Sequence, residues 1–271
     1  MSPETILAGL PIWRAAPVLT PLMEGRTNRN FIIQDGDERY FGRVGIDLPH
    51  HEVWRGNERA CAIAAAEGGV SPRVHYADGG ILITAFIDGQ TLRPADMHDE
   101  AAMTGTAQVL RRLHAIKAPD TLPIRCGVAI SRRYLSETSD TELPLPREQI
   151  IARMGEPTLT GDRLVHSDII PENLMRVPQG LLLIDWEYSG RGIPEVDLGS
   201  VIANADLTET DTRQLLDAYG PHRPELVEQQ RVALIVREAM WCLAQMRHAG
   251  PEGDLVPYTK LCIERMLREF R

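Results

Sequence analysis

The chain contains few cysteines, few aromatic residues and no long hydrophobic segment. Its apolar runs, such as 181–184, fall far short of the roughly 20 residues that a membrane-spanning helix needs. The N-terminus carries the acidic residue Glu4, and no basic stretch leads into an apolar one, which argues against a signal peptide. These absences predict a soluble, cytoplasmic protein with no membrane insertion.

The four cysteines are scattered and form neither a CxxC pair nor a cluster with histidines, so neither zinc nor a disulfide framework is expected. They are Cys61, Cys126, Cys242 and Cys262. A net charge of −9 over 271 residues argues against nucleic-acid binding, which requires a basic face. The same acidity is compatible with a cationic substrate, because an acidic surface attracts cations.

Secondary-structure signals separate a strand-rich first third from a mainly helical remainder. The first third contains predicted strands at 29–34, 39–45, 73–77 and 81–86, a helix at 52–67 that ends at Gly68-Gly69, and a helix start at Ser2-Pro3-Glu4. After it come a helix at 99–116, strands at 163–166, 174–177 and 181–184, and helices from about 195, the longest at 224–248. The proline-rich region 118–146 gives no assignment. We expect an α+β fold of two lobes, an antiparallel-sheet lobe with one helix (1–88) and a larger, mainly helical lobe (89–271), with a hinge at 85–89.

The strongest chemical signal is the segment His166-Ser167-Asp168-Ile169-Ile170-Pro171-Glu172-Asn173, which is followed by a strand that ends in Asp185. An Asp and an Asn five residues apart on one loop can share a phosphoryl-transfer site. There Asp168 accepts the proton of an attacking hydroxyl, and Asn173 helps to hold Mg²⁺. Asp185 supplies a second hard oxygen ligand, which Mg²⁺ prefers. The alternative is a polar turn and a strand with a capping Asp.

This pattern resembles the catalytic and metal-binding signature of the kinase-like phosphotransferases. Ser167 stands where the family usually has Gly or Asn. The resemblance extends over residues 20 to 245 and is closest to the choline and ethanolamine kinases, in their bacterial branch, within the aminoglycoside phosphotransferase superfamily. It implies a protein-kinase-like fold and transfer of phosphate from ATP, with Mg²⁺, to an alcohol.

The resemblance also implies nucleotide-binding residues in the N-terminal half. Arg43 and Glu58 match the strand–helix ion pair that positions ATP phosphates in kinases; a surface salt bridge is the alternative. The turn Gly25-Arg26-Thr27-Asn28 is similar to the family turn that covers the phosphates, and Thr27 and Asn28 are its candidate contacts, although such turns are also common in hairpins. The backbone at Ala85 and Phe86 matches the hinge that binds adenine, and Phe86 is equally compatible with a core position.

Two further residues match family positions. Asp197 corresponds to an acid that braces the catalytic loop from the start of a helix, and a helix N-cap is the alternative. His114 also matches a family signature, but a structural role at a helix end is the better interpretation.

The acceptor implied by the resemblance is a small cationic amino alcohol, with choline or ethanolamine foremost. Choline kinases hold a quaternary ammonium by cation–π contacts and carboxylates, and the candidate substrate residues here are Glu187, Tyr188, Trp241 and Tyr258. The typical W-x-x-W motif is replaced by Trp241-Cys242-Leu243-Ala244, and Asn204 stands at a family acid position, so the cage is thinner. Trp241 is equally compatible with helix packing. An aminoglycoside, another antibiotic or thiamine remains an alternative acceptor, and a nucleotide-binding pseudokinase is the non-enzymatic alternative.

Overall fold

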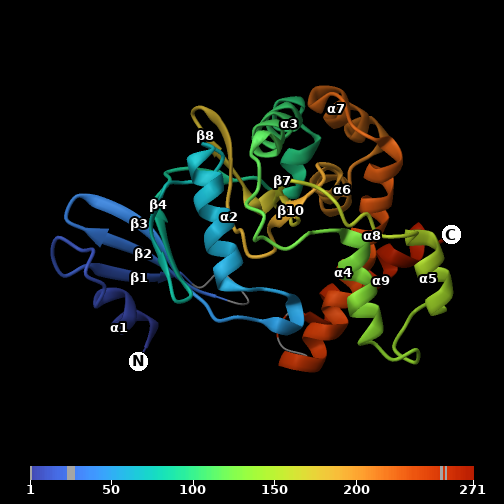
Figure 1. The fold of residues 1–271 in the computed structure, drawn as a ribbon, viewed down its shortest axis with the longest axis horizontal. Helices are drawn as coiled ribbons and strands as arrows, with labels where there is room; N and C mark the ends of the chain where they lie inside the picture. The colour runs from blue at the N-terminus through green and yellow to red at the C-terminus, as the bar shows by residue number, and fades with distance from the viewer. Residues whose placement is uncertain (1, 23–27, 251–252, 254) are drawn as a thin grey trace.

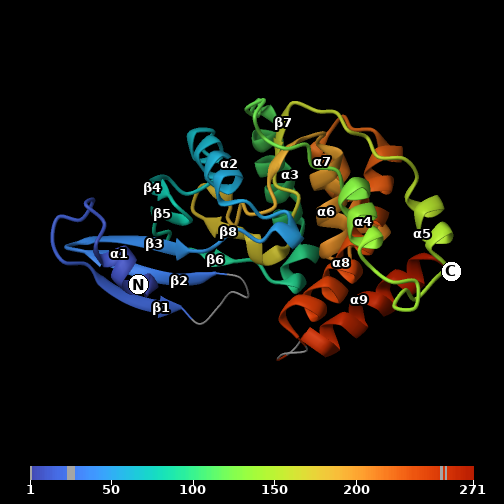
Figure 2. The ribbon, with the colours of Figure 1, turned by 60° about the horizontal axis from the view of Figure 1, so that its bottom comes forward.

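An antiparallel sheet forms one end of the molecule, and helices form the other, as the computed structural model shows for residues 2–22, 28–250, 253 and 255–271 (Figure 1). The N-terminus lies by the sheet and the C-terminus at the opposite, helical end (Figure 2). This arrangement confirms the predicted α+β class, with a small N-terminal sheet lobe and a larger helical lobe. The boundary between 88 and 89 stays a prediction.

The small lobe contains a five-stranded antiparallel sheet in the order β1-β2-β3-β5-β4. Its strands are β1 (Val18–Leu22), β2 (Arg29–Asp35), β3 (Glu38–Val44), β4 (Val74–Asp78) and β5 (Ile81–Ala85). Alternate residues of β2, Phe31 and Ile33, are buried against Leu7 of the short helix α1 (Pro3–Ala8), as period-two patterning requires. Gly36, with φ +61°, closes the β2–β3 turn. The predicted strands and the helix start at Ser2 are confirmed.

Helix α2 (Arg55–Glu67) crosses between the sheet and the helical lobe (Figure 1). It begins three residues later than predicted, because Glu52 adopts a left-handed backbone (φ 55°) after a 3-10 turn at Pro49–His51. Its small buried residues, Cys61, Ala62 and Ala65, pack into the main core, which also includes residues of α3. The helix therefore carries Arg55 and Glu58 at its first turn, close to the end of β3.

The helical lobe is organised around a long central helix, α8. Its helices are α3 (Glu100–Ala115), α4 (Gly127–Ser136), α5 (Arg147–Met154), α6 (Glu195–Asn204), α7 (Glu209–Tyr219), α8 (Pro224–Ala249) and α9 (Leu255–Glu269). The helix α8 packs against α4, α6 and α9. The predicted helices at 99–116 and 224–248 are confirmed, and the unassigned region 118–146 contains α4. No described helix is long and apolar enough to cross a membrane.

The loops that carry Asp168 and Asp185 are attached to short strands in the helical lobe. β7 (Arg163–Val165) pairs with β10 (Gly190–Gly192), and β8 (Leu174–Val177) pairs with both β6 (Gln90–Thr91) and β9 (Gly180–Leu183). The three strands predicted from apolar runs are therefore present as β7, β8 and β9. Residues 166–173 follow β7, and residues 184–189 follow β9, so that two loops separated in sequence only by the β8–β9 hairpin lie next to each other.

Candidate active site

The loop that carries Asp168 is held in a strained conformation by a buried carboxylate. Ser167 has φ +65°, a left-handed backbone that costs a non-glycine residue about 1 kcal/mol or more. Asp197, fully buried on α6, accepts hydrogen bonds from the backbone N–H groups of His166 (2.9 Å) and Ser167 (2.7 Å). These charge-assisted bonds offset the strain and fix the direction in which the next residue, Asp168, leaves the loop.

Asp197 also accepts from a histidine behind the loop. His114 Nε2 lies 3.0 Å from Asp197 Oδ2, and its Nδ1 lies 2.9 Å from the Tyr219 hydroxyl. The N-cap of α6 is Pro194, with no side-chain cap, so Asp197 acts on the loop and not on the end of its own helix. His114 is buried and bonded on both nitrogens, which agrees with the structural role expected for it.

Asn173 and Asp185 lie side by side because of the β8–β9 register. Leu174 pairs with Leu183, and the Ile184 N–H donates to the Asn173 carbonyl at 3.1 Å, which places Asp185 next to Asn173. The Asn173 side-chain nitrogen donates to the Asp168 carbonyl at 2.9 Å, so its side-chain oxygen is the atom that would face a metal. A carboxylate and an amide oxygen are the hard ligands that Mg²⁺ prefers, and this pair fits the ion.

The predicted ion pair of the small lobe is buried and reaches Asp185. Arg43, on β3, contacts Glu58, on α2, and both side chains are at most 6% exposed. Arg43 Nη1 also lies 2.5 Å from Asp185 Oδ1. Burial opposes ionisation of Asp185, but the Arg43 guanidinium outweighs it and lowers the pKa of that carboxyl. The surface-salt-bridge alternative for Arg43 is therefore excluded, and the pair stands beside the candidate metal ligands.

A second buried arginine, Arg55, extends this network and was missed at the sequence level. It donates to Glu58 Oε2 at 2.7 Å and to Glu187 Oε2 at 3.2 Å. Its position three residues before Glu58 on one helix face was the signal that could have revealed it. Asn28 Nδ2 also donates to Glu187, at 3.1 Å. Burial and the nearby Asp185 raise the pKa of the Glu187 carboxyl.

The other predicted nucleotide contacts have mixed outcomes. Thr27 lies outside the described residues. At the hinge, the Ala85 N–H donates to the Arg73 carbonyl (2.8 Å) and the Phe86 N–H to the Arg39 carbonyl (3.1 Å). Both donors are therefore used within the small lobe, and an adenine contact at this hinge would have to use its other backbone groups. The Arg39 guanidinium lies 4.4 Å from the centre of the Phe86 ring.

Arg237, on α8, contacts the predicted catalytic base directly and was not anticipated from the sequence. Its Nη2 donates to Asp168 Oδ1 at 2.7 Å, and its Nη1 donates to the Ser167 carbonyl at 2.8 Å. The side chain is only 7% exposed, and its guanidinium lies 5.7 Å from the centre of the Tyr188 ring. Burial disfavours the charged guanidinium, but the charges of Asp168 and Glu238 outweigh it and raise its pKa. One guanidinium thus holds both the strained loop and its carboxylate.

The three predicted aromatic substrate residues come together beside Arg237. Trp241 Nε1 donates to the Tyr188 hydroxyl at 3.1 Å, and the Tyr258 hydroxyl, on α9, donates to Glu238 Oε1 at 2.8 Å. On its other side Trp241 stacks on His51, with ring centres 5.3 Å apart. Trp241 therefore packs against His51 and also lies next to Tyr188, one of the other predicted substrate residues.

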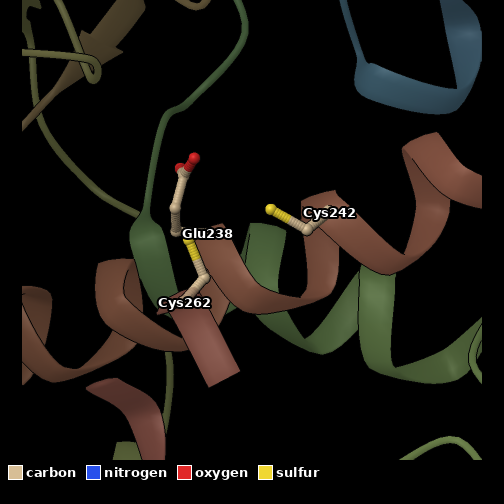
Figure 3. Close-up of side chains that lie close together, drawn as sticks. All are labelled: Glu238, Cys242 and Cys262. Carbon is tan, nitrogen blue, oxygen red and sulfur yellow. The ribbon is translucent and has the colours of Figure 1, made fainter. Parts of the chain in front are cut away.

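Glu238 also lies next to two buried thiols (Figure 3). A carboxylate oxygen of Glu238 and the sulfurs of Cys242 and Cys262 lie within 4.8 Å of one another. Sequence spacing gave no indication of this cluster, because Cys262 comes from α9 and the other two residues from α8. The thiols contact each other, and this contact together with burial raises the pKa of Cys242.

The fold and this site define a kinase-like phosphotransferase, and comparison with known proteins agrees. The phosphotransferase enzyme family profile matches residues 18–228, so the chain belongs to that family. Protein LicA of Haemophilus influenzae is 39% identical over 211 residues, covering 72% of this chain and 60% of the relative. The chain thus spans less than two thirds of that relative's length.

Two solved structures share the fold. A choline/ethanolamine kinase family protein from Mesorhizobium loti superposes with a TM-score of 0.77 at 24% identity, covering 98% of this chain and 92% of the other. Choline kinase LicA from Streptococcus pneumoniae gives a TM-score of 0.73 at 19% identity, covering 93% of each chain. At these identities the likeness establishes the fold. The predicted resemblance to choline and ethanolamine kinases is therefore confirmed as a similarity of fold.

Proposed function

We propose that this protein transfers the γ-phosphoryl group of ATP to the hydroxyl of a small cationic amino alcohol, with choline or ethanolamine as the first candidates. The observation that carries the proposal is the placement of Asp168, Asn173 and Asp185 on two neighbouring loops, with Asn173 bonded to the Asp168 carbonyl and Asp185 in contact with Arg43 of the buried Arg43–Glu58 pair. Phosphoryl transfer needs a base for the acceptor, oxygen ligands for a metal and a cation for the phosphates, and the candidates for these roles are Asp168, the pair Asn173 and Asp185, and Arg43. The names of the family relatives support the choice of acceptor.

In the proposed reaction, Asp168 orients the acceptor hydroxyl and takes its proton. Because Arg237 holds Oδ1, the other oxygen, Oδ2, is the base. The acceptor oxygen forms a bond to the γ-phosphorus, the bond from this phosphorus to the β–γ bridging oxygen breaks, and ADP leaves. Since the carboxylate and the loop backbone are both held by Arg237 and Asp197, little reorganisation is needed at the moment of reaction.

Asn173 and Asp185 are the proposed Mg²⁺ ligands, and the ion would neutralise phosphate charge. Arg43 lies against Asp185 and is held by Glu58, so its remaining donors can bind phosphate oxygens. Arg55 supports the same pair from α2 through its contact with Glu58. Glu58 therefore serves to position Arg43, as the strand–helix pair does in protein kinases.

The test is release of ADP by the purified protein with MgATP and a panel of choline, ethanolamine, thiamine and an aminoglycoside. Asp168→Asn serves as the blank, because it keeps the shape of the side chain and removes the base. We expect turnover that depends on one amino alcohol and is absent in the blank. Equal turnover by Asp168→Asn, or turnover with the aminoglycoside alone, would refute the proposal.

A further inference from the structure

We infer that Glu238, rather than Glu187, is the residue that selects a positively charged acceptor, by pairing with its ammonium group beside Trp241 and Tyr258. This inference rests on the proposed function and names the carboxylate that decides its substrate. Glu187 is 8% exposed and faces Arg55 and Asn28 at 3.2 and 3.1 Å, so its charge is already matched on the side of the site that holds Arg43.

Glu238 is more exposed than Glu187. Its side chain is 21% exposed, three times as much as that of Arg237, and it extends away from the α8 ribbon in Figure 3. The Tyr258 hydroxyl holds one carboxylate oxygen at 2.8 Å, and Trp241 follows three residues later, on the same face of α8. A fixed carboxylate next to aromatic side chains is an arrangement that binds an organic ammonium ion well.

The charges around Asp168 also favour a single positive charge on the acceptor. Asp168 and Glu238 are acidic, and Arg237, which contacts both, is the cation between them. The three groups together carry one net negative charge. An acceptor with one ammonium group would neutralise this charge, whereas an anionic acceptor would double it.

The distance between the two carboxylates also suits a short acceptor. Arg237 Nη2 lies 2.7 Å from Asp168 Oδ1 and 3.4 Å from Glu238 Oε2. Because both contacts share one nitrogen, the two carboxylate oxygens lie no more than about 6 Å apart. An alcohol and an ammonium group separated by two carbons lie about 3–4 Å apart, so such a molecule can place its hydroxyl at Asp168 and its cation at Glu238. A monocationic alcohol with a two-carbon spacer therefore fits this separation.

The nearby thiols offer a different use for Glu238, as a metal ligand with Cys242 and Cys262. The Arg237 guanidinium, 3.4 Å from the carboxylate, opposes a divalent ion more strongly than it opposes an ammonium group, because the repulsion grows with the charge of the ion. The same experiment can separate the two uses, since a metal site would depend on the thiols and an ammonium site would not.

The experiment compares choline with its uncharged isostere, 3,3-dimethylbutan-1-ol, in which carbon replaces the nitrogen. The ratio of kcat/KM for the two acceptors measures charge selection at constant shape. We expect the wild-type protein to prefer choline at least tenfold and Glu238→Gln to lose most of that preference, with the KM for MgATP unchanged. Glu187→Gln should slow both acceptors alike. Glu225→Gln, at the exposed start of α8, and the double variant Cys242→Ser/Cys262→Ser should keep the wild-type preference.

Each outcome has one meaning. If the wild-type protein phosphorylates neither molecule nor any amino alcohol, the proposed function itself fails. If it prefers choline and Glu238→Gln retains that preference, or Glu187→Gln alone abolishes it, the function stands and the assignment of Glu238 is overturned. Loss of the preference in the double cysteine variant would likewise overturn it, in favour of a bound metal.

Discussion

Replacing Arg237 by glutamine should damage catalysis and stability together, because one guanidinium supports both the base and the backbone of the loop. The change removes the charge-assisted hydrogen bond to Asp168, worth about 1.5–3 kcal/mol, and the bond to the Ser167 carbonyl, worth about 1 kcal/mol. Asp168 is 18% exposed and can regain some hydration. We therefore expect a loss in unfolding free energy of about 2–3 kcal/mol.

The effect on turnover follows from the position of the base. Without Arg237, the Asp168 carboxylate can rotate and the strained Ser167 backbone is held by Asp197 alone, so the acceptor hydroxyl and its base are misaligned. A misplacement of this kind costs about 100-fold in rate. We expect kcat to fall by about that factor with little change in the KM for MgATP, and Arg237→Lys, which keeps the charge, should recover part of it.

The assay combines steady-state kinetics with urea unfolding, and Arg231→Gln is the matched control. Arg231 lies on the same helix, but its guanidinium pairs with Glu228 and Glu269 and not with the loop of Asp168, so its loss should leave kcat unchanged. If Arg237→Gln kept kcat within threefold of wild type and lost no more stability than Arg231→Gln, the positioning role of Arg237 would be refuted.

Three further predictions address the loop, the metal and the response to pH. Asp197→Ala leaves the buried N–H groups of His166 and Ser167 without their acceptor. In urea titrations the unfolding free energy should therefore fall by about 3–5 kcal/mol. A loss below about 1 kcal/mol would contradict the role of Asp197 in holding the loop. Asp185→Asn should raise the Mg²⁺ concentration for half-maximal activity at least tenfold, and an unchanged Mg²⁺ titration would remove Asp185 from the metal site. Burial lowers the pKa of His51 from 6.5 to about 4, so between these pH values the unfolded chain binds a proton that the native protein does not. The unfolding free energy should therefore fall as the pH drops from 6.5 towards 4, by about 2 kcal/mol at pH 5. His51→Asn should remove this part of the pH dependence.

The sequence predicted those parts of the protein whose signals are local. The β2–β3 hairpin follows from alternating residues around a glycine turn, and the long helix α8 follows from its periodicity. The chemistry of the loop was also predictable, because Asp168 and Asn173 need only one loop, and Asp185 only the next strand, to come together.

The parts that were missed depend on packing between distant segments. Arg237 reaches Asp168 across 69 residues of sequence, and neither helix periodicity nor motif spacing contains that contact. The thiol cluster requires the pairing of α8 with α9 in the same way. Helix α4 was missed for a local reason, since it follows Cys126, an N-cap residue that makes no side-chain hydrogen bond, within a proline-rich stretch.

We propose that this site moves a phosphoryl group from ATP to an amino alcohol, with Asp168 as the base. The most direct measurement is ³¹P NMR of wild-type and Asp168→Asn protein, each incubated with MgATP and choline or ethanolamine. We expect a phosphomonoester of the amino alcohol to grow at the same rate as ADP with the wild-type protein, and neither signal to grow with Asp168→Asn. ADP formed together with inorganic phosphate and no phosphomonoester, or equal product from the variant, would contradict the claim.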